Sequence, residues 1–415
     1  MSFQSLHIEN WQQFSNVDIT FHPNLTIITG ANGSGKTTIL TLLARHYGWD
    51  HISLATPKAD KATGLIKFFS RFGFFTDKHD DRVIGRICYE GGSEAKLVVP
   101  EAGTAAQYQV QIQSQQAVSC FYIPSHRQTF SYRRITQINM GKKDKQAAFS
   151  EVSQSHRNKY NGGHTEPSSF FMKGTILGWI INGYGVRSPT KIVMPADDEQ
   201  IQHFEGFRDV LRVILPPTLG FEDIEVRDSE LVFLCNGGRD EFLFETASGG
   251  ISALIDMAWQ IYMYPSKEMI SYTVVIDEIE NHLHPTLQRT LLSSLLKAFP
   301  RARFIVSTHS PLIVTSVRDA EVCVLRYNDQ KRVESTRLNL KNQVKTAIDV
   351  LDEVLGVATT IPPWAEASLK EIVDKFASSD LDTQSLAALR IELKGVGLER
   401  FMVSAIENIA ERGAQ

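Results

Sequence analysis

A glycine-rich run near the beginning of the chain has the residue types and the spacing needed to hold phosphate groups. It reads Gly30-Ala31-Asn32-Gly33-Ser34-Gly35-Lys36-Thr37-Thr38 and lies between an apolar segment, 25–29, and an amphipathic helical pattern. In such a loop, glycines let backbone N–H groups face the phosphates, and the helix N-terminus adds positive charge. Lys36 can reach the outer phosphates and Thr37 can ligate Mg²⁺. We therefore expect a nucleoside triphosphate to bind at Asn32, Gly33, Ser34, Gly35, Lys36, Thr37 and Thr38.

Two adjacent carboxylates follow a second apolar segment, 274–276. Open α/β sheets place their ligands at the carboxyl ends of the strands, where Asp277 and Glu278 would stand. We expect Asp277 to hold Mg²⁺ together with Thr37, and Glu278 to position the attacking water as general base. Two exposed acids at a strand end are the alternative interpretation.

The next apolar segment, 304–306, leads to Ser307-Thr308-His309 at the same expected edge. A histidine there can contact the γ-phosphate, although a lone histidine at a strand end is more often a surface or capping residue. The neighbouring acids favour a catalytic role for His309.

A second candidate anion site precedes another helical pattern. Ser248, Gly249 and Gly250 offer a hydroxyl and two flexible amides at a helix N-terminus. Because one loop already binds the phosphates, this second anion site suggests contact with a nucleotide that is bound to a different subunit. A serine helix cap followed by a tight turn is the alternative.

The elements that must position these residues form an α/β pattern. The two apolar segments 274–276 and 304–306 flank a helical pattern, 287–296, which predicts a βαβ unit in a buried parallel sheet. Residues 82–116 alternate short strand patterns with glycine-containing breaks, which predicts antiparallel hairpins. We expect a mostly parallel core sheet with a flanking antiparallel sheet.

Changes in pattern suggest four regions. These are an N-terminal half of a nucleotide-binding head, 1–125, a mainly helical insertion, 126–218, the C-terminal half of the head, 219–340, and a helical C-terminal region, 341–415.

Composition is that of a water-soluble globular chain of 415 residues, with 42% hydrophobic and 22% charged residues. No stretch is long and apolar enough to span a bilayer and the start lacks a leader pattern, so we expect a cytoplasmic protein without a membrane partner. The net charge of −4 argues against a generally basic nucleic-acid surface. Four scattered cysteines lack metal or redox spacing and are expected to be buried and reduced: Cys88, Cys120, Cys235 and Cys323.

Taken in order, the four motifs resemble the Walker A, signature, Walker B and histidine-switch elements of an ABC-type ATPase. The resemblance covers roughly residues 1–50 and 220–330, and the opening segment 8–14 is similar to that of the DNA-repair and chromosome-maintenance branch. It implies a head-to-head dimer that encloses two ATP molecules with Mg²⁺, each between the Walker motifs of one head and the signature of the other.

Some residues depart from the family pattern. Ala247 stands where leucine is usual and Ile251 where glutamine or glutamate is usual, which leaves the Ser-Gly-Gly chemistry intact. Gln128 is the one reasonable candidate for the Q-loop glutamine, which in this family helps to hold Mg²⁺ and water. Residues 280–285 fall at the family's D-loop, and a separate metal site at their glutamate and histidines is the alternative.

The interval between Walker A and the signature has no sustained heptads, and nothing after His309 suggests a nuclease. This compact head resembles the ATPase subunits of bacterial antiphage systems such as PARIS and Septu, and the ATPase half of overcoming-lysogenization-defect nucleases. The resemblance implies an ATP-hydrolysing homodimer, or higher homo-oligomer, that senses infection and controls a separate effector, expected to be a nuclease, with a phage protein as a candidate trigger. A DNA-repair or recombination ATPase acting directly on DNA is the alternative, and a transporter ATPase is a weaker third.

A basic stretch with interleaved aromatic residues could bind nucleic acid or an acidic phage protein. A solvated loop is the alternative. The stretch comprises Arg127, Phe130, Tyr132, Arg133, Arg134, Lys142, Lys143 and Lys145.

Overall fold

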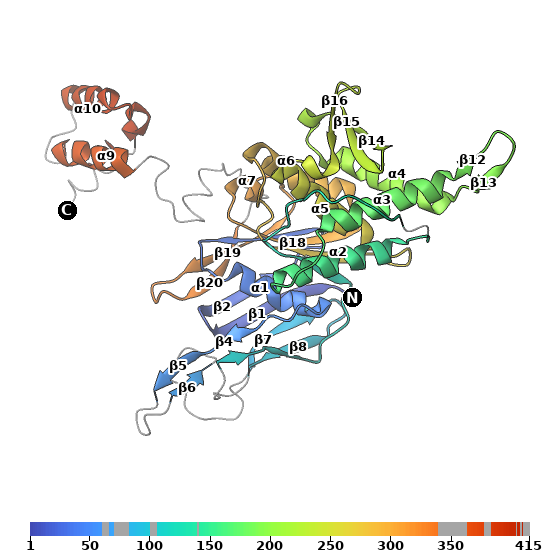
Figure 1. Ribbon diagram of the computed structural model, residues 1–415. Helices are drawn as coiled ribbons and strands as arrows, with labels where there is room; N and C mark the ends of the chain where they lie inside the picture. The colour runs from blue at the N-terminus through green and yellow to red at the C-terminus, as the bar shows by residue number, and fades with distance from the viewer. Residues whose placement is uncertain are drawn as a thin grey trace. The chain divides into compact units, whose positions relative to one another are not determined.

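The computed structural model describes residues 1–59, 66–69, 83–99, 106–138, 141–338, 363–376 and 383–403, with 405, 406 and 409 (Figure 1). The chain divides into two compact units, residues 1–350 and 351–415. All of the expected chemical motifs lie in the first unit.

The first unit is built on an eleven-stranded mixed sheet with the order β10-β8-β7-β1-β2-β20-β19-β3-β18-β17-β11. Five neighbouring strands at one side, from β19 to β11, are parallel, and the strands from β10 to β2 are antiparallel. The strands are β1 Phe3–Trp11, β2 Phe14–Thr20, β3 Leu25–Gly30, β7 Val83–Tyr89, β8 Glu94–Val98, β10 Gln111–Gln113, β11 Cys120–Ile123, β17 Tyr272–Ile276, β18 Ala302–Thr308, β19 Glu321–Tyr327 and β20 Val333–Leu338. The expected α/β fold is confirmed, and β20 joins the parallel and antiparallel parts by pairing with both β19 and β2.

The central parallel strands are mostly apolar and are buried along their whole length, as expected where both faces of a sheet are covered. Every residue of β3, β17 and β11 is buried. Strand β18 pairs Thr308 with Thr29 of β3 and Val306 with Ile276 of β17, so these three strands end close to one another at the same edge.

Helices pack on this sheet and on one another, and three of them, α2, α3 and α4, lie within residues 126–218. Helix α1 follows β3 and packs on the parallel strands, while α2 contacts α3 and α5, and α4 contacts α3, α5 and α6. Figure 1 shows these helices together, with the β12–β13 hairpin extending away from them. Their bounds are α1 Lys36–Ala44, α2 Lys145–Tyr160, α3 Ser168–Tyr184, α4 Asp198–Ile214, α5 Gly249–Met263, α6 Pro285–Ala298 and α7 Pro311–Val314, with short 3-10 helices η1 Arg45–Tyr47, η2 Pro217–Leu219 and η3 Phe244–Thr246.

The remaining strands form small antiparallel sheets outside the large one. One has three strands, in the order β14-β15-β16, and the others have two. They are β14 Phe221–Arg227, β15 Glu230–Cys235 and β16 Asp240–Leu243, the hairpin β12 Val186–Arg187 and β13 Ile192–Met194, the pair β4 Ser53–Leu54 and β9 Gln107–Tyr108, and the pair β5 Thr56–Ala59 and β6 Ile66–Phe69.

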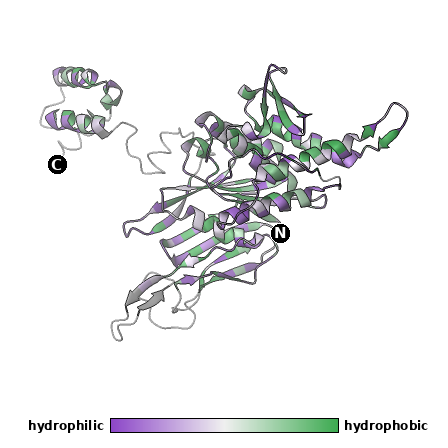
Figure 2. Cartoon of the chain, viewed as in Figure 1, coloured by the Kyte–Doolittle hydropathy of each residue, from purple (hydrophilic) through white to green (hydrophobic). Residues whose placement is uncertain are grey.

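The second unit contains α9 Pro363–Phe376, α10 Thr383–Gly395 and the 3-10 helix η4 Glu399–Phe401, around a small apolar core that includes Val373 and Leu389. A helical pattern in the sequence at 348–355 lies outside the described residues. Figure 2 shows hydrophobic and hydrophilic residues interspersed along the strands of the large sheet and along the helices of the first unit. Among the described helices, none combines the length and apolar composition needed to cross a bilayer. All four cysteines are free, and only Cys88 is not fully buried.

Candidate functional site

The glycine-rich loop after β3 requires its glycines for backbone conformation and for space. Gly33 and Gly35 have φ of +77° and +94°, in the left-handed region that favours glycine. A Cβ at Gly35 would lie 2.3 Å from the ring of Phe14, and one at Gly30 would lie 2.4 Å from the carbonyl oxygen of Leu325. The Ser34 hydroxyl is buried and has no partner within the part of the chain that the structure describes. These features fit a loop that closes around an acceptor-rich ligand.

Lys36 begins α1 and turns back over this loop. Its side chain is 5% exposed, and its Nζ donates to the carbonyl oxygens of Gly30 at 2.9 Å and Ala31 at 3.0 Å. Burial lowers the pKa of Lys36 to about 8, against the attraction of Glu278 and Asp277. A negatively charged ligand would therefore stabilise the protonated amine where it stands.

The next residue, Thr37, connects the loop directly to Asp277 at the end of β17. Thr37 Oγ1 donates to Asp277 Oδ2 at 2.9 Å, and Ser307 Oγ donates to Asp277 Oδ1 at 2.5 Å. Asp277 is 1% exposed; burial raises the pKa of its carboxyl, and the two hydroxyl bonds oppose that rise. A hydroxyl and a carboxylate in contact are oxygen ligands of the kind that Mg²⁺ prefers, so Thr37 and Asp277 fit a magnesium site.

Glu278 and His309 face each other beside this pair. Glu278 Oε1 lies 3.7 Å from His309 Nε2, and both side chains are 32% exposed. Glu278 has a φ of +44°, its amide donates to Ser307 Oγ at 2.8 Å, and its Oε2 accepts from Asn281 Nδ2 at 2.7 Å. The carboxylate and the imidazole are thus held at the open edge of the sheet, where water can reach them.

The structure therefore brings Lys36, Thr37, Asp277, Glu278 and His309 to one edge of the sheet. The physical reason is the shared register of β3, β18 and β17. The catalytic and ligand roles assigned to these residues remain predictions.

The signature residues have a different environment. Helix α5 begins at Gly249 with Ser248 as its N-cap, and the Ser248 side chain makes no capping hydrogen bond. Ser248 and Gly249 are exposed, and a Cβ at Gly249 would meet nothing within 4 Å. The simple helix-cap alternative therefore lacks its hydrogen bond, and the N-terminus of α5 presents its amides to solvent.

Gln128 is buried, at 9% exposure, after the end of β11. Its Oε1 accepts from the backbone N–H of Ser168 at the start of α3, at 3.2 Å. Its Nε2 is buried with no partner among the described residues. The side-chain oxygen thus bonds the start of α3, and the predicted role of Gln128 in holding Mg²⁺ and water stays a prediction.

The basic stretch does not form one free cationic surface. Arg127 is buried, while Lys142 pairs with Asp197, Lys143 with Glu151 at 2.7 Å and Arg133 with Glu166 at 3.3 Å. Lys145 lies over the ring of Tyr262 at 3.9 Å, and burial lowers its pKa to about 8. Most of these cationic side chains are thus buried, paired with carboxylates or stacked on a ring of the same chain.

Sequence reasoning missed three residues that shape the site. Ser307 bonds both Asp277 and the amide of Glu278, Asn281 holds the Glu278 carboxylate, and Arg127 contacts the backbone that follows β17. Ser307 sits next to the histidine motif, which could have drawn attention to it. Arg127 was assigned to the basic stretch, and no local pattern marks it as buried.

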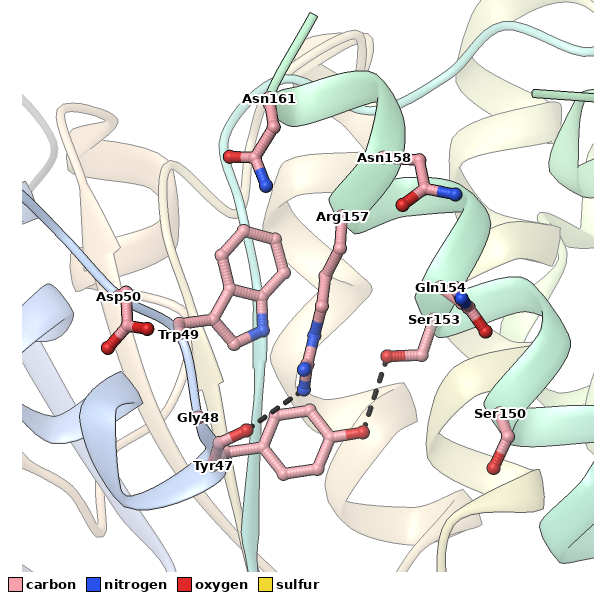
Figure 3. Close-up of a pocket in the computed structure, with 10 residues that line it drawn as sticks. All are labelled: Tyr47, Gly48, Trp49, Asp50, Ser150, Ser153, Gln154, Arg157, Asn158 and Asn161. Carbon is pink, nitrogen blue, oxygen red and sulfur yellow. Dashed lines mark hydrogen bonds between the residues drawn. The ribbon is translucent and has the colours of Figure 1, made fainter. Parts of the chain in front are cut away.

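A cavity of about 480 Å³ lies elsewhere in the first unit, between the turn after α1 and one face of α2 (Figure 3). Arg157 from α2 donates to the carbonyl oxygen of Tyr47 at 2.9 Å and stacks on the Tyr47 ring. Gly48, Trp49, Asp50 and polar side chains of α2 complete the lining, and none of the predicted site residues belongs to it.

Two protein families match the chain. One, described as "AAA domain", matches residues 5–161. The other, described as "AAA domain, putative AbiEii toxin, Type IV TA system", matches residues 121–315. The two ranges together include both sides of the site, so the chain is similar to these AAA domains over the residues that form it.

Individual relatives point in the same direction. Septu protein PtuA of Bacillus mycoides (strain KBAB4) is 31% identical over 138 residues, which are 32% of this chain and 19% of the relative. Retron Vc95 probable ATPase of Vibrio cholerae serotype O1 biovar El Tor is 43% identical over 58 residues, 14% of this chain and 11% of the relative. Septu protein PtuA of Bacillus thuringiensis is 22% identical over 387 residues, 89% of this chain and 87% of the relative. The first two matches span less than a fifth of each relative's length. The two Septu relatives confirm the expected resemblance to Septu-type ATPases.

Proposed function

We propose that this chain, an ABC-type ATPase similar to those of Septu and retron systems, binds and hydrolyses ATP as a subunit of an antiphage defence complex. The observation that carries the proposal is the bond from Thr37 Oγ1 to Asp277 Oδ2, which unites the phosphate loop and the paired carboxylates in one site. Glu278 and His309 beside that bond supply the groups that hydrolysis needs.

The residues divide the reaction among them. The loop amides and Lys36 bind the β- and γ-phosphates, and Thr37 and Asp277 hold Mg²⁺. When bound, Mg²⁺ neutralises charge on these phosphates. Glu278 accepts a proton from the attacking water as general base, and His309 orients the γ-phosphate end of the site.

We propose that two heads close on ATP, each supplying Ser248, Gly249 and Gly250 to the nucleotide of its partner. The support is the exposed, uncapped start of α5, whose amides are free to receive a phosphate from outside the chain. Closure would control a separate effector, a nuclease, with the helical insertion 126–218 and the region 341–415 as candidate docking parts. A phage protein is the candidate trigger.

The proposal is tested first with purified full-length chain. Wild type should hydrolyse ATP in the presence of Mg²⁺, and Glu278→Gln should bind ATP, turn over slowly and accumulate as a dimer in mass photometry. Failure of the wild type to hydrolyse ATP, with nucleotide bound, would contradict the assigned chemistry.

The biological role needs a second experiment. Cells that express the chain with its neighbouring gene should resist phage infection, and Lys36→Ala should remove the resistance. A salt-sensitive affinity of the chain alone for DNA, together with DNA-stimulated hydrolysis and no resistance, would instead favour a repair ATPase.

A further inference from the structure

Arg127 follows β11, the strand next to β17, and its side chain contacts the segment after β17 that carries Glu278, the proposed general base. Strand β11 pairs in parallel with β17, with Ile123 opposite Ile276. Arg127 comes four residues after the end of β11, and its side chain turns toward the segment that follows β17. The sheet register therefore brings together two segments that are 150 residues apart in the chain.

The guanidinium of Arg127 donates to four backbone carbonyls of this segment. Nη2 lies 3.3 Å from the oxygen of Asp277 and 3.1 Å from that of Glu278. Nη1 lies 3.3 Å from the oxygen of Ile279 and 3.2 Å from that of Asn281. A planar fork with two terminal nitrogens can serve two such pairs at once, whereas the single ammonium of lysine cannot.

The contacted segment has a strained backbone. Glu278 has φ of +44°, and His282, directly after the segment, has φ of +68°, conformations that residues with side chains seldom adopt. Four carbonyl oxygens of this segment also converge on one point and accept from a shared donor. Arg127 is 7% exposed and supplies that donor.

The charge on Arg127 is maintained in this buried place. Burial lowers the pKa of Arg127 to about 10, and four surrounding carboxylates, including Asp277 and Glu278, oppose the change. The guanidinium therefore stays protonated at neutral pH. The next residue, Gln128, bonds the start of α3, so adjacent side chains connect α3 and the segment after β17.

We infer that Arg127 is a positioning residue that fixes the backbone of residues 277–281 so that the Glu278 carboxylate faces His309. The inference rests on the proposed function, because it assigns Arg127 a role in the hydrolysis of ATP through Glu278. Arg127 touches the backbone carbonyls of the segment and is not itself a catalytic group.

The experiment compares Arg127→Lys and Arg127→Gln with Arg157→Lys, all in the full-length chain. Arg157 is the matched control because, like Arg127, it donates to a backbone carbonyl. It lies away from the sheet edge, in the cavity of Figure 3, where it stacks on aromatic rings. We expect kcat to fall at least about tenfold for both Arg127 variants, while the Kd for ATP stays within about twofold of wild type. Arg157→Lys should leave kcat unchanged.

A double-mutant cycle separates positioning from general stability. If Arg127 acts through Glu278, Arg127→Lys combined with Glu278→Gln should turn over no more slowly than Glu278→Gln alone. Hydrogen exchange should increase in residues 277–283 of Arg127→Lys.

Three outcomes would overturn the inference. They are a wild-type kcat in Arg127→Lys, an equal further loss in the Glu278→Gln background, or the loss of ATP binding or of the fold in both variants, which would make Arg127 a structural residue. Wild type and Glu278→Gln, assayed in parallel, test the proposed function separately. A wild type that does not hydrolyse ATP contradicts the proposed function. A wild type that hydrolyses ATP, with an equally active Arg127→Lys, contradicts only the positioning role of Arg127.

Discussion

At the edge of the large sheet, the side chains expected to bind nucleotide already bond to one another, whereas at the start of α5 the expected ligand groups face solvent. Thr37 and Asp277 share a hydrogen bond, and Lys36 bonds the carbonyls of its own loop. Ser248 makes no capping bond, and Gly249 has open space around it.

This difference is what a site divided between two chains requires. The edge of the sheet is organised by the fold of one chain, because parallel strands place their ends side by side. A helix N-terminus exposed without a cap retains several N–H groups and positive charge for an outside acceptor. The comparison thus predicts that a change at the sheet edge disables the nucleotide site of the same chain, while a change at α5 disables the nucleotide site of the neighbouring chain.

The largest expected effect is the loss of nucleotide binding in Lys36→Ala. Removal of the ammonium takes away the charge that meets the outer phosphates, so the Kd for ATP should rise at least about 100-fold, or about 2.7 kcal/mol. Fluorescent-nucleotide titration measures this affinity. Lys267→Ala, which removes an exposed lysine paired with Glu199, is the control and should bind normally. Retained affinity in Lys36→Ala would disprove the assigned phosphate loop.

Glu278→Gln should separate binding from turnover at the same edge. The amide keeps the size of the side chain but cannot accept a proton from water, so kcat should fall at least about 100-fold, within the range for general bases. ATP affinity should stay within a few-fold of wild type. Steady-state assays of phosphate release measure the change, and unchanged turnover would remove Glu278 from the mechanism.

Much of this edge was predictable from local sequence, because each motif directly follows an apolar strand. Segments 274–276 and 304–306 became β17 and β18, and their pairing fixes the positions of Asp277 and His309. The union of the parallel and antiparallel strands through β20 was not predictable, since it depends on pairing between β20 and β2, segments more than 300 residues apart.

Arg127 illustrates the same limit in the site. Near several other basic residues it has the pattern of a solvated loop, and its burial depends on carbonyls that follow β17. The left-handed conformation of Glu278 likewise depends on Ser307, Asn281 and Arg127 together, and no propensity of glutamate favours it. Tertiary contacts decide both features, so a local pattern cannot reveal them.

Ser248→Arg tests the other side of the comparison. A large side chain at the start of α5 should prevent that α5 from docking on the nucleotide of the neighbouring chain, reducing turnover at that site at least about tenfold while each chain still binds ATP. Ser150→Arg, at an exposed position on α2, is the control.

Mixing the two defective variants gives the sharper result. A dimer of Ser248→Arg with Glu278→Gln contains one site with an intact Glu278 and an intact partner signature, so the mixture should recover part of the wild-type rate. A mixture as inactive as its components, under conditions in which wild type hydrolyses ATP, would mean that α5 does not serve a partner.

The smallest expected effect concerns the pH dependence of ATP affinity at the sheet edge. Burial holds the pKa of Lys36 at about 8 in the free chain, and the protonated amine is the form that attracts phosphate. As the pH rises from 8 to 9, the protonated fraction falls and the Kd should increase about fivefold. The terminal phosphate of ATP is fully ionised over this range, so the change reports on the protein.

Bound phosphates raise the pKa of Lys36, so calorimetry in two buffers at pH 8.5 should detect net proton uptake on binding. Affinity that is constant from pH 8 to 9, without proton uptake, would mean that the Lys36 amine does not contact the phosphates. The sheet edge of one chain would then lack a ligand group that the contrast with α5 assigns to it.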